Sequence, residues 1–123
     1  VTNVLDNLLA AGGIDLVMAV GPAAMMKSVS LATEPYAVKT LVSLNPIMID
    51  GTGMCGGCRV HVKGQTKFGC VDGPDFDGHD IDWDLLMARQ RVYVDEEKHA
   101  LDEYHRCKMG QSVETPVKGR SGQ

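Results

Sequence analysis

The chain has 123 residues, of which 44% are hydrophobic and 23% are charged, so it is long enough to bury one modest core. Its net charge is −4 at pH 7 and its basic residues are scattered, which excludes the basic stripe of a typical nucleic-acid-binding protein. No apolar run is long enough to span a membrane, and no signal peptide opens the chain. We therefore expect a cytoplasmic protein without a nucleic-acid or membrane partner. The chain begins at Val1 directly with a helical pattern, so we interpret it as a piece of a longer polypeptide.

The first third of the chain predicts alternating helices and strands. Apolar residues recur at helical spacing over residues 2–11, and residues 14–20 form a nearly continuous apolar run. Such a run is typical of a strand buried on both faces of a parallel sheet. A second helix is expected between Pro22 and Pro35, followed by a second strand over residues 39–44. This order indicates an α/β fold class.

The remaining elements are shorter and less regular. Residues 59–62 and 66–71 predict a short β-hairpin, and residues 73–82, rich in Gly, Pro and Asp, predict an irregular surface loop. Asp80 or Asp82 can cap a helix that carries Trp83 as its anchor. A last helix is expected to open at Asp95 and to end near residue 109.

The cysteine pattern carries the chemistry. Cys55 and Cys58 are two residues apart, a spacing at which two thiolates can bind one metal centre, and Cys70 supplies a third soft ligand after the hairpin. Glycines around them allow backbone N–H groups to turn toward the sulfurs. Asp50 stands where a plant-type C-x4-C-x2-C run has its first cysteine, which makes it a candidate fourth ligand. An aspartate beside glycines also often binds its own turn, so both interpretations of Asp50 stay open.

A structural zinc site is the competing interpretation of these cysteines. Zinc ribbons also use C-x2-C pairs, and His61 or His79 could complete a tetrahedron. Zinc sites usually draw on two such pairs, however, and this chain has one. The glycine density before Cys55 favours an iron–sulfur cluster.

Other candidate residues have simpler interpretations. Val20, Gly21 and Pro22 stand between a strand and a helix, where open α/β sheets bind ligands, although a plain turn explains them as well. Cys107 is expected to be a core thiol of the last helix. His99 and His105 are expected to face solvent. No phosphate-binding loop, nucleophile elbow or H-E-x-x-H motif occurs, so no catalytic acid, base or nucleophile is predicted.

Taken as a set, several segments resemble the carboxyl-terminal half of the dihydroorotate dehydrogenase electron-transfer subunit family. They are residues 20–26, 40–46, 49–58 and 69–74. Within the family, the sequence is most similar to the small subunit of the NADH-dependent ferredoxin:NADP oxidoreductase, also called sulfide dehydrogenase. The resemblance covers about residues 1 to 110, and its cysteine motif is highly specific.

This resemblance implies an α/β architecture in three parts. Residues 1–47 are expected to be the carboxyl-terminal part of a ferredoxin-reductase-like NAD(P)-binding domain with a parallel sheet. Residues 48–110 are expected to form an iron–sulfur cluster-binding domain with a short β-hairpin and carboxyl-terminal helices. Residues 111–123 are expected to be a flexible tail.

The resemblance also implies a ligand set and a cofactor. Asp50, Cys55, Cys58 and Cys70 are expected to hold a [2Fe–2S] cluster, for which zinc can substitute in recombinant protein. Electrons would pass between NAD(P)H, FAD and a larger redox subunit through this cluster.

The nucleotide site implied by the resemblance lies at Val20, Gly21 and Pro22, beside the nicotinamide. Val20 stands where the family has a cysteine, which leaves the nicotinamide contacts open. The flavin-binding barrel and the pyrophosphate-binding turn of the family are not among these 123 residues. We therefore expect the fragment alone to be inactive, and its bare sheet edge to favour self-association.

Overall fold

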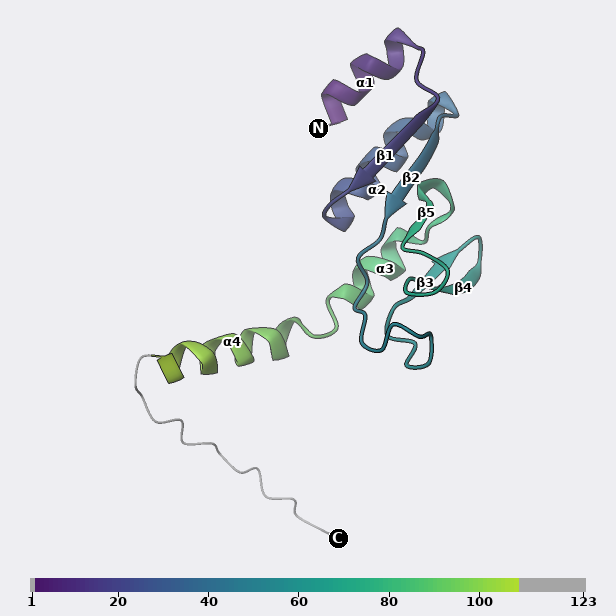
Figure 1. Ribbon diagram of the computed structural model, residues 1–123. Helices are drawn as coiled ribbons and strands as arrows, with labels where there is room; N and C mark the ends of the chain where they lie inside the picture. Colours follow the sequence, from purple (N-terminus) through teal and green to yellow (C-terminus); the bar gives the residue numbers. More distant parts are fainter. Residues whose placement is uncertain (1, 109–123) are drawn as a thin grey trace. The chain divides into compact units, whose positions relative to one another are not determined.

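The computed structural model describes residues 2–108, so the predicted tail at residues 111–123 lies outside the described residues. The described elements are, in chain order, α1 (Thr2–Ala11), β1 (Leu16–Val20), α2 (Ala23–Thr33), the 3-10 helix η1 (Glu34–Tyr36), β2 (Lys39–Ser43), β3 (Arg59–Val62), β4 (Gln65–Phe68), β5 (Asp75–Asp77), the 3-10 helix η2 (Gly78–Asp80), α3 (Trp83–Gln90) and α4 (Val94–Lys108) (Figure 1). Residues 2–90 form one compact unit, and residues 91–108 belong to a second.

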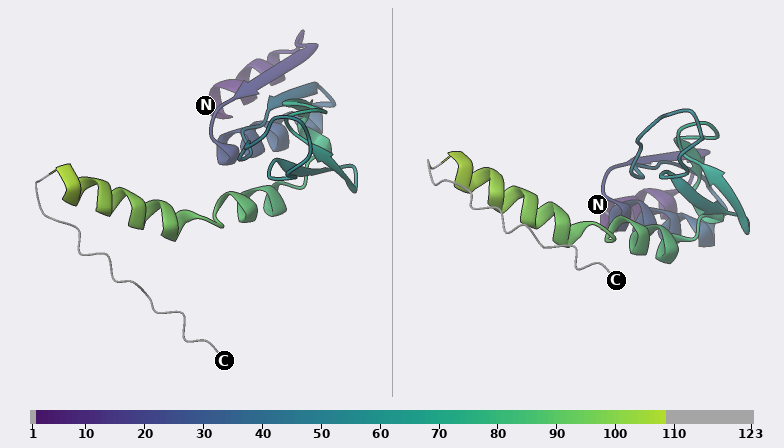
Figure 2. Two further views of the ribbon diagram at one scale, coloured as in Figure 1. Left: turned by 60° about the horizontal axis from the view of Figure 1, so that its bottom comes forward. Right: turned by 90° about the horizontal axis from the view of Figure 1, so that it is seen from below.

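The predicted helix–strand–helix–strand order is confirmed. β1 and β2 pair in parallel, with Leu16 opposite Lys39 and Val20 opposite Ser43. The connection between them is α2, which lies against one face of the two strands (Figure 2). α1 packs on α2 and ends where the Gly12 N–H donates to the Leu9 carbonyl, 3.1 Å away.

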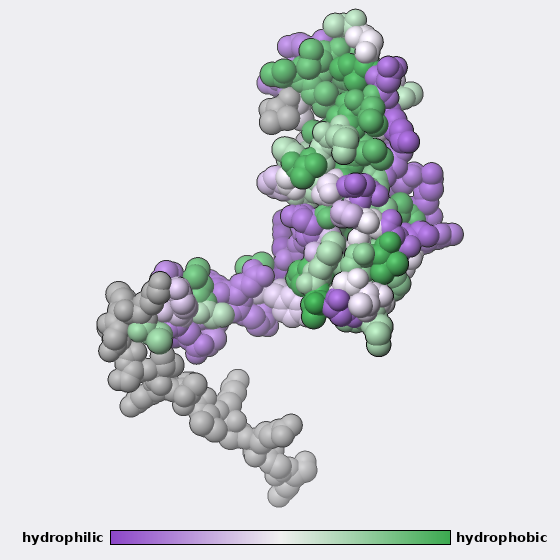
Figure 3. Space-filling model, viewed as in Figure 1, coloured by the Kyte–Doolittle hydropathy of each residue, from purple (hydrophilic) through white to green (hydrophobic). Residues whose placement is uncertain are grey.

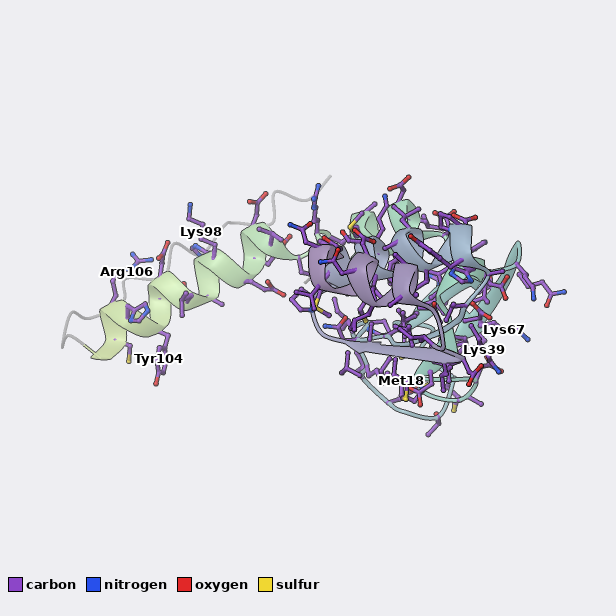
Figure 4. The ribbon with its side chains drawn as sticks, turned by 90° about the horizontal axis from the view of Figure 1, so that it is seen from above. Met18, Lys39, Lys67, Lys98, Tyr104 and Arg106 are labelled. Atoms are coloured by element: carbon purple, nitrogen blue, oxygen red, sulfur yellow. The ribbon has the colours of Figure 1, made fainter. Side chains whose placement is uncertain are left out.

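The prediction that the first strand is buried on both faces is wrong in this chain. Leu16, Met18 and Val20 of β1 are 47%, 62% and 70% exposed, whereas Ala19 is buried against α2. The reason is that β1 is an edge strand, and in residues 2–108 only one of its faces is covered. Hydrophobic side chains consequently gather at the surface over α1 and β1 (Figure 3), and Met18 projects from the strand (Figure 4).

The prediction of an irregular loop over residues 73–82 is also wrong. β5 pairs antiparallel with β2, with Asp77 opposite Leu41, and completes a three-stranded sheet in the order β1-β2-β5. Phe76 is buried between two exposed or half-buried aspartates, which is the polar–apolar–polar alternation of a half-buried strand. The high Asp and Gly content concealed this short pattern.

The hydrophobic core joins residues from distant parts of the sequence. Its buried members are Ala19, Met26, Val29, Val42, Leu44, Val60, Phe76, Ile81, Trp83 and Leu86. Trp83 anchors α3 as predicted, and its Nε1 donates to the Gly78 carbonyl at 3.0 Å. The predicted boundary near residue 47 stays a prediction, although the sheet and this core draw on residues from both sides of it.

A buried polar network ties η2 to the helix and sheet. Thr33 Oγ1 lies 2.6 Å from Thr40 Oγ1 and 2.9 Å from His79 Nε2. His79 Nδ1 lies 3.5 Å from Asp77 Oδ1. The order Asp–His–Thr resembles a hydrolase triad, but Thr33 has no exposed surface, so no substrate can reach it. The network therefore has a structural role.

The predicted hairpin is confirmed as β3 and β4, which pair antiparallel with Arg59 opposite Phe68. Lys63 N donates to the Asp80 carbonyl at 2.8 Å, which fastens the hairpin to η2. Asp82 caps α3 as predicted, because its Oδ1 accepts the Leu85 N–H at 3.0 Å.

The described part of the second unit is dominated by α4, which confirms the last predicted helix. Tyr104 and Arg106 project from opposite sides of it (Figure 4). His99 and His105 are exposed, as expected, but Cys107 is exposed too, so its prediction as a core thiol is wrong. None of residues 94–107 of this helix is buried, so within this range there is no core for the thiol to enter. Among the helices of residues 2–108, none is long and apolar enough to cross a membrane.

Candidate metal centre

The segment that carries the cysteines is a long loop between β2 and β3, here called the cysteine loop (residues 45–58). It lies at the end of the first unit that is opposite α1 (Figure 1). Gly53 has a φ of +84°, a left-handed conformation that side chains rarely adopt, and a Cβ there would lie 3.0 Å from Val71 Cγ2. This glycine therefore lets the cysteine loop pass close to the segment around Cys70.

Asp50 holds the cysteine loop by its carboxylate. Its Oδ1 accepts the Thr52 N–H at 2.9 Å and its Oδ2 accepts the Cys55 N–H at 2.7 Å. These two backbone donors, Thr52 first, lower the pKa of Asp50, so it stays ionised. The turn-binding role considered for Asp50 is thus present. Because each carboxylate oxygen has more than one lone pair, this role is compatible with metal ligation.

Cys58 and Cys70 form a close pair. Their sulfurs are 3.3 Å apart and share a hydrogen bond, and the Cys70 N–H donates to Cys58 Sγ at 3.5 Å. Burial opposes ionisation of Cys58, but its hydrogen bonds with Cys70 outweigh it and lower the pKa of Cys58. The pKa of Cys70 is raised, first by the hydrogen bond with Cys58 and then by burial. The close contact therefore couples the ionisation of the two thiols.

Cys55 belongs to the same loop and is exposed. Its sulfur accepts the Gly57 N–H at 3.4 Å. A Cβ on Gly57 would lie 3.5 Å from this sulfur and 3.4 Å from the Ile47 carbonyl oxygen, so the loop is tightly wound around the thiol.

The four candidate ligands lie in one region but do not form a single tetrahedral group. Asp50 and Cys55 are joined through the Cys55 N–H, and Cys58 and Cys70 are in direct contact. Within residues 2–108, no three His, Cys, Asp or Glu side chains converge as they would around one metal ion. The arrangement is two pairs of donors.

The histidines considered as zinc ligands have other positions. His79 is held by Thr33 in the polar network beneath β2. His61 lies on β3 opposite Thr66, and its carbonyl accepts the Asp82 N–H at 3.0 Å.

Two further features of the site were not recognised in the sequence. Ile49, Met54 and Val71 are exposed apolar side chains around the cysteines. Arg89 and Gln90, at the end of α3, contact the cysteine loop. An Arg-Gln pair at the end of a helix matches no sequence motif, so only the folded chain reveals these contacts. The apolar residues next to Cys55 and Cys70, in contrast, are visible in the sequence.

Val20, Gly21 and Pro22 lie where the sequence places them, between the carboxyl end of β1 and the start of α2. Val20 is exposed, and the Pro22 carbonyl accepts the N–H groups of Met25 and Met26 at 2.9 and 3.1 Å. Their role in nucleotide binding stays a prediction.

The part of the chain that contains the site matches a known family model. Residues 45–82, which include all four candidate ligands, match the family model of the iron–sulfur cluster binding domain of dihydroorotate dehydrogenase B.

Curated relatives extend the similarity toward the amino terminus. The chain is 49% identical over 104 residues to a dihydroorotate dehydrogenase B (NAD(+)) electron transfer subunit homolog of Thermotoga maritima, covering 85% of this chain and 37% of that protein. It is 55% identical over 86 residues to an uncharacterized protein in the adh 3' region of Clostridium beijerinckii, covering 70% of this chain and 29% of that protein.

A solved structure has a similar fold. A chain of the NADH-dependent reduced ferredoxin-NADP oxidoreductase, a structure described in connection with flavin-based electron bifurcation, superposes with a TM-score of 0.76 and 48% identity. The match covers 84% of this chain and 37% of that chain. The predicted resemblance is confirmed, and the chain spans little more than a third of the length of these two fuller matches.

Proposed function

Since the chain resembles the carboxyl-terminal part of the dihydroorotate dehydrogenase electron-transfer subunits, we propose that it is the electron-transfer module of a flavin and iron–sulfur oxidoreductase. In this proposal residues 45–82 hold a [2Fe–2S] cluster through Asp50, Cys55, Cys58 and Cys70. When bound, such a cluster would supply one-electron transfer.

The arrangement of the donors in two pairs is the observation that carries this proposal. A [2Fe–2S] cluster has two irons, each of which takes two protein ligands, whereas a structural zinc ion takes four ligands on one centre. Cys58 and Cys70, with sulfurs 3.3 Å apart, suit one iron. Asp50 and Cys55 suit the other, because the Asp50 carboxylate accepts the Cys55 backbone N–H at 2.7 Å and also interacts with the Cys55 side chain.

The donor chemistry fits this group. Three thiols supply soft ligands, and Asp50 supplies one hard oxygen that is already ionised because two N–H groups bind it. The N–H groups of Gly57 and Cys70 point at the sulfurs of Cys55 and Cys58. Hydrogen bonds of this kind stabilise negative charge on cluster sulfurs and set the reduction potential.

The wider reaction rests on the relatives. We propose that the whole enzyme moves electrons between NAD(P)H, FAD and a larger redox subunit. Val20, Gly21 and Pro22 would contact the nicotinamide, because the carboxyl end of β1 and the start of α2 form the kind of edge at which such sheets bind nucleotides. The 123 residues alone would lack the flavin site and turn nothing over. A cytoplasmic location stays a prediction.

The proposal is tested by purifying the chain under anaerobic conditions and measuring its visible absorption, iron and acid-labile sulfide. We expect a coloured protein with about two irons and two sulfides per chain. A colourless protein that holds one zinc tightly under these conditions would support a zinc-stabilised interaction domain instead. Protein purified in air does not decide the question, because zinc can occupy emptied thiolates.

A further inference from the structure

Two residues at the end of α3 donate hydrogen bonds to the cysteine loop. Arg89 Nη2 donates to the Gly57 carbonyl at 3.4 Å, between Cys55 and Cys58. The neighbouring Gln90 Nε2 donates to both the carbonyl and the side-chain oxygen of Asn45, at 3.3 and 3.2 Å. Two consecutive residues of one helix thus hold both ends of the loop.

Arg89 is a half-buried cation without an acidic partner. Its side chain is partly buried, and no Asp or Glu among residues 2–108 forms an ion pair with it. Removing a guanidinium from water is costly unless negative charge compensates it. Its Nη2 lies 3.4 Å from the Gly57 carbonyl oxygen, on the loop that carries Cys55 and Cys58. A bound cluster with its thiolates supplies the negative charge that this guanidinium lacks.

We propose that Arg89 is a positioning residue that holds the cysteine loop and, by its positive charge, raises the reduction potential of the cluster. The inference rests on the proposed function, since it requires a bound cluster. When the cluster takes up an electron, its net charge becomes one unit more negative. A nearby fixed cation stabilises the reduced form more than the oxidised form, so the potential rises.

The peptide group between Gly57 and Cys58, which Arg89 contacts, increases the effect of the cation on the reduction potential. The Gly57 carbonyl and the Cys58 N–H belong to one peptide group, so a guanidinium on the oxygen polarises the N–H on the other side. The cation is also held in place, because its helix is anchored by buried Trp83 and Leu86 and capped by Asp82. A cation held in this way costs little reorganisation when the electron arrives.

Arg59 provides an internal comparison. Its side chain lies over Gly56 on the same loop, with Nε 3.7 Å from where a Cβ of Gly56 would be, but it is exposed. Water and salt screen an exposed charge more than a half-buried one. Removing Arg59 is therefore expected to change the potential less than removing Arg89.

The test is a mediated redox titration of the anaerobically purified chain, followed by visible absorption. The variants are Arg89→Gln and Arg89→Met, which remove the charge, and Arg89→Lys, which keeps it. Arg91→Gln is the matched control, because exposed Arg91 loses the same charge two residues away. In Arg89→Gln we expect the ratio of reduced to oxidised cluster at a fixed potential to fall about tenfold, or about 59 mV for a one-electron couple. Arg89→Lys and Arg91→Gln should stay near the wild-type chain.

The outcomes separate this inference from the proposed function. A wild-type chain without a cluster would refute the proposed function and, with it, the role of Arg89. A wild-type chain with a cluster whose potential is unchanged in both neutral variants would overturn the role of Arg89 alone. If both neutral variants lose the cluster while Arg89→Lys keeps it, the need for a cation at this position is supported. Loss of the cluster from all three variants would leave Arg89 as a packing residue and overturn the inference.

Discussion

The sheet region (α2, β1, β2 and β5) and the cysteine loop are held by different forces. In the sheet region, Met26 and Val42 have no exposed surface, and burial of such side chains is the main stabilising term. In the cysteine loop, Ile49 and Met54 are exposed, and order comes from hydrogen bonds of Asp50 and from contacts with the end of α3. The comparison teaches that burial of apolar side chains holds the sheet region, whereas a few hydrogen bonds hold the cysteine loop.

The largest effect is expected from a ligand. Cys58→Ala should abolish cluster binding, because it removes a buried sulfur and breaks the pair with Cys70. Visible absorption should be lost while far-UV circular dichroism stays close to wild type. Cys107→Ala on exposed α4 is the control and should keep full absorption. A Cys58→Ala chain with unchanged colour would remove this residue from the ligand set.

The second effect concerns the sheet region. Phe76→Ala should lower the free energy of unfolding by about 3 to 5 kcal/mol, because it leaves a cavity in the core. Urea denaturation followed by circular dichroism measures it. Met54→Ala, which truncates an exposed residue of the cysteine loop, is the control and should change stability by less than about 0.5 kcal/mol. Equal losses in the two variants would erase the contrast between the two regions.

The third effect separates the two roles of Asp50. Asp50→Ala should weaken cluster retention about tenfold, which corresponds to about 1.4 kcal/mol, because it loses the backbone hydrogen bonds and the oxygen ligand together. Asp50→Cys should retain a cluster with an altered spectrum and potential. Retention during incubation with a chelator and the visible spectrum measure both. If neither change affects the cluster, Asp50 is a turn residue only.

The smallest effect concerns the exposed face of β1. We expect the isolated chain to self-associate weakly, because Leu16, Met18 and Val20 leave an apolar patch beside an unpaired strand edge. Met18→Lys should reduce this association, measured by analytical ultracentrifugation over a concentration series. Lys98→Met on exposed α4 is the control for a change of surface charge. A wild-type chain that stays monomeric at every concentration contradicts the prediction.

The sequence predicts elements well where one local pattern decides. The parallel β1–α2–β2 unit, the hairpin and the capped α3 follow from periodicity, Pro22 and Asp82. β5 was missed because its three residues carry two aspartates, and its strand character comes from pairing with β2. The exposure of β1 and of Cys107 could not be read from composition, because it depends on which surfaces the rest of the chain covers.

The ligands of the candidate site can be predicted from the sequence, but the contacts that position them cannot. The spacing of the cysteines predicts Cys55, Cys58 and Cys70 as ligands. The position of Asp50, where the all-cysteine pattern has its first cysteine, makes it the candidate fourth ligand. No local sequence pattern predicts that Cys58 pairs with Cys70 or that Arg89 donates to the Gly57 carbonyl, because both contacts join residues far apart in the chain.

Low-temperature electron paramagnetic resonance of the anaerobically purified, partially reduced chain tests the central claim most directly. With Asp50, Cys55, Cys58 and Cys70 as ligands, we predict the signal of one unpaired electron per reduced cluster, in a protein with about two irons per chain. Cys58→Ala should lack the signal. An iron-free wild-type chain that is silent after reduction, with one zinc bound, would contradict the account.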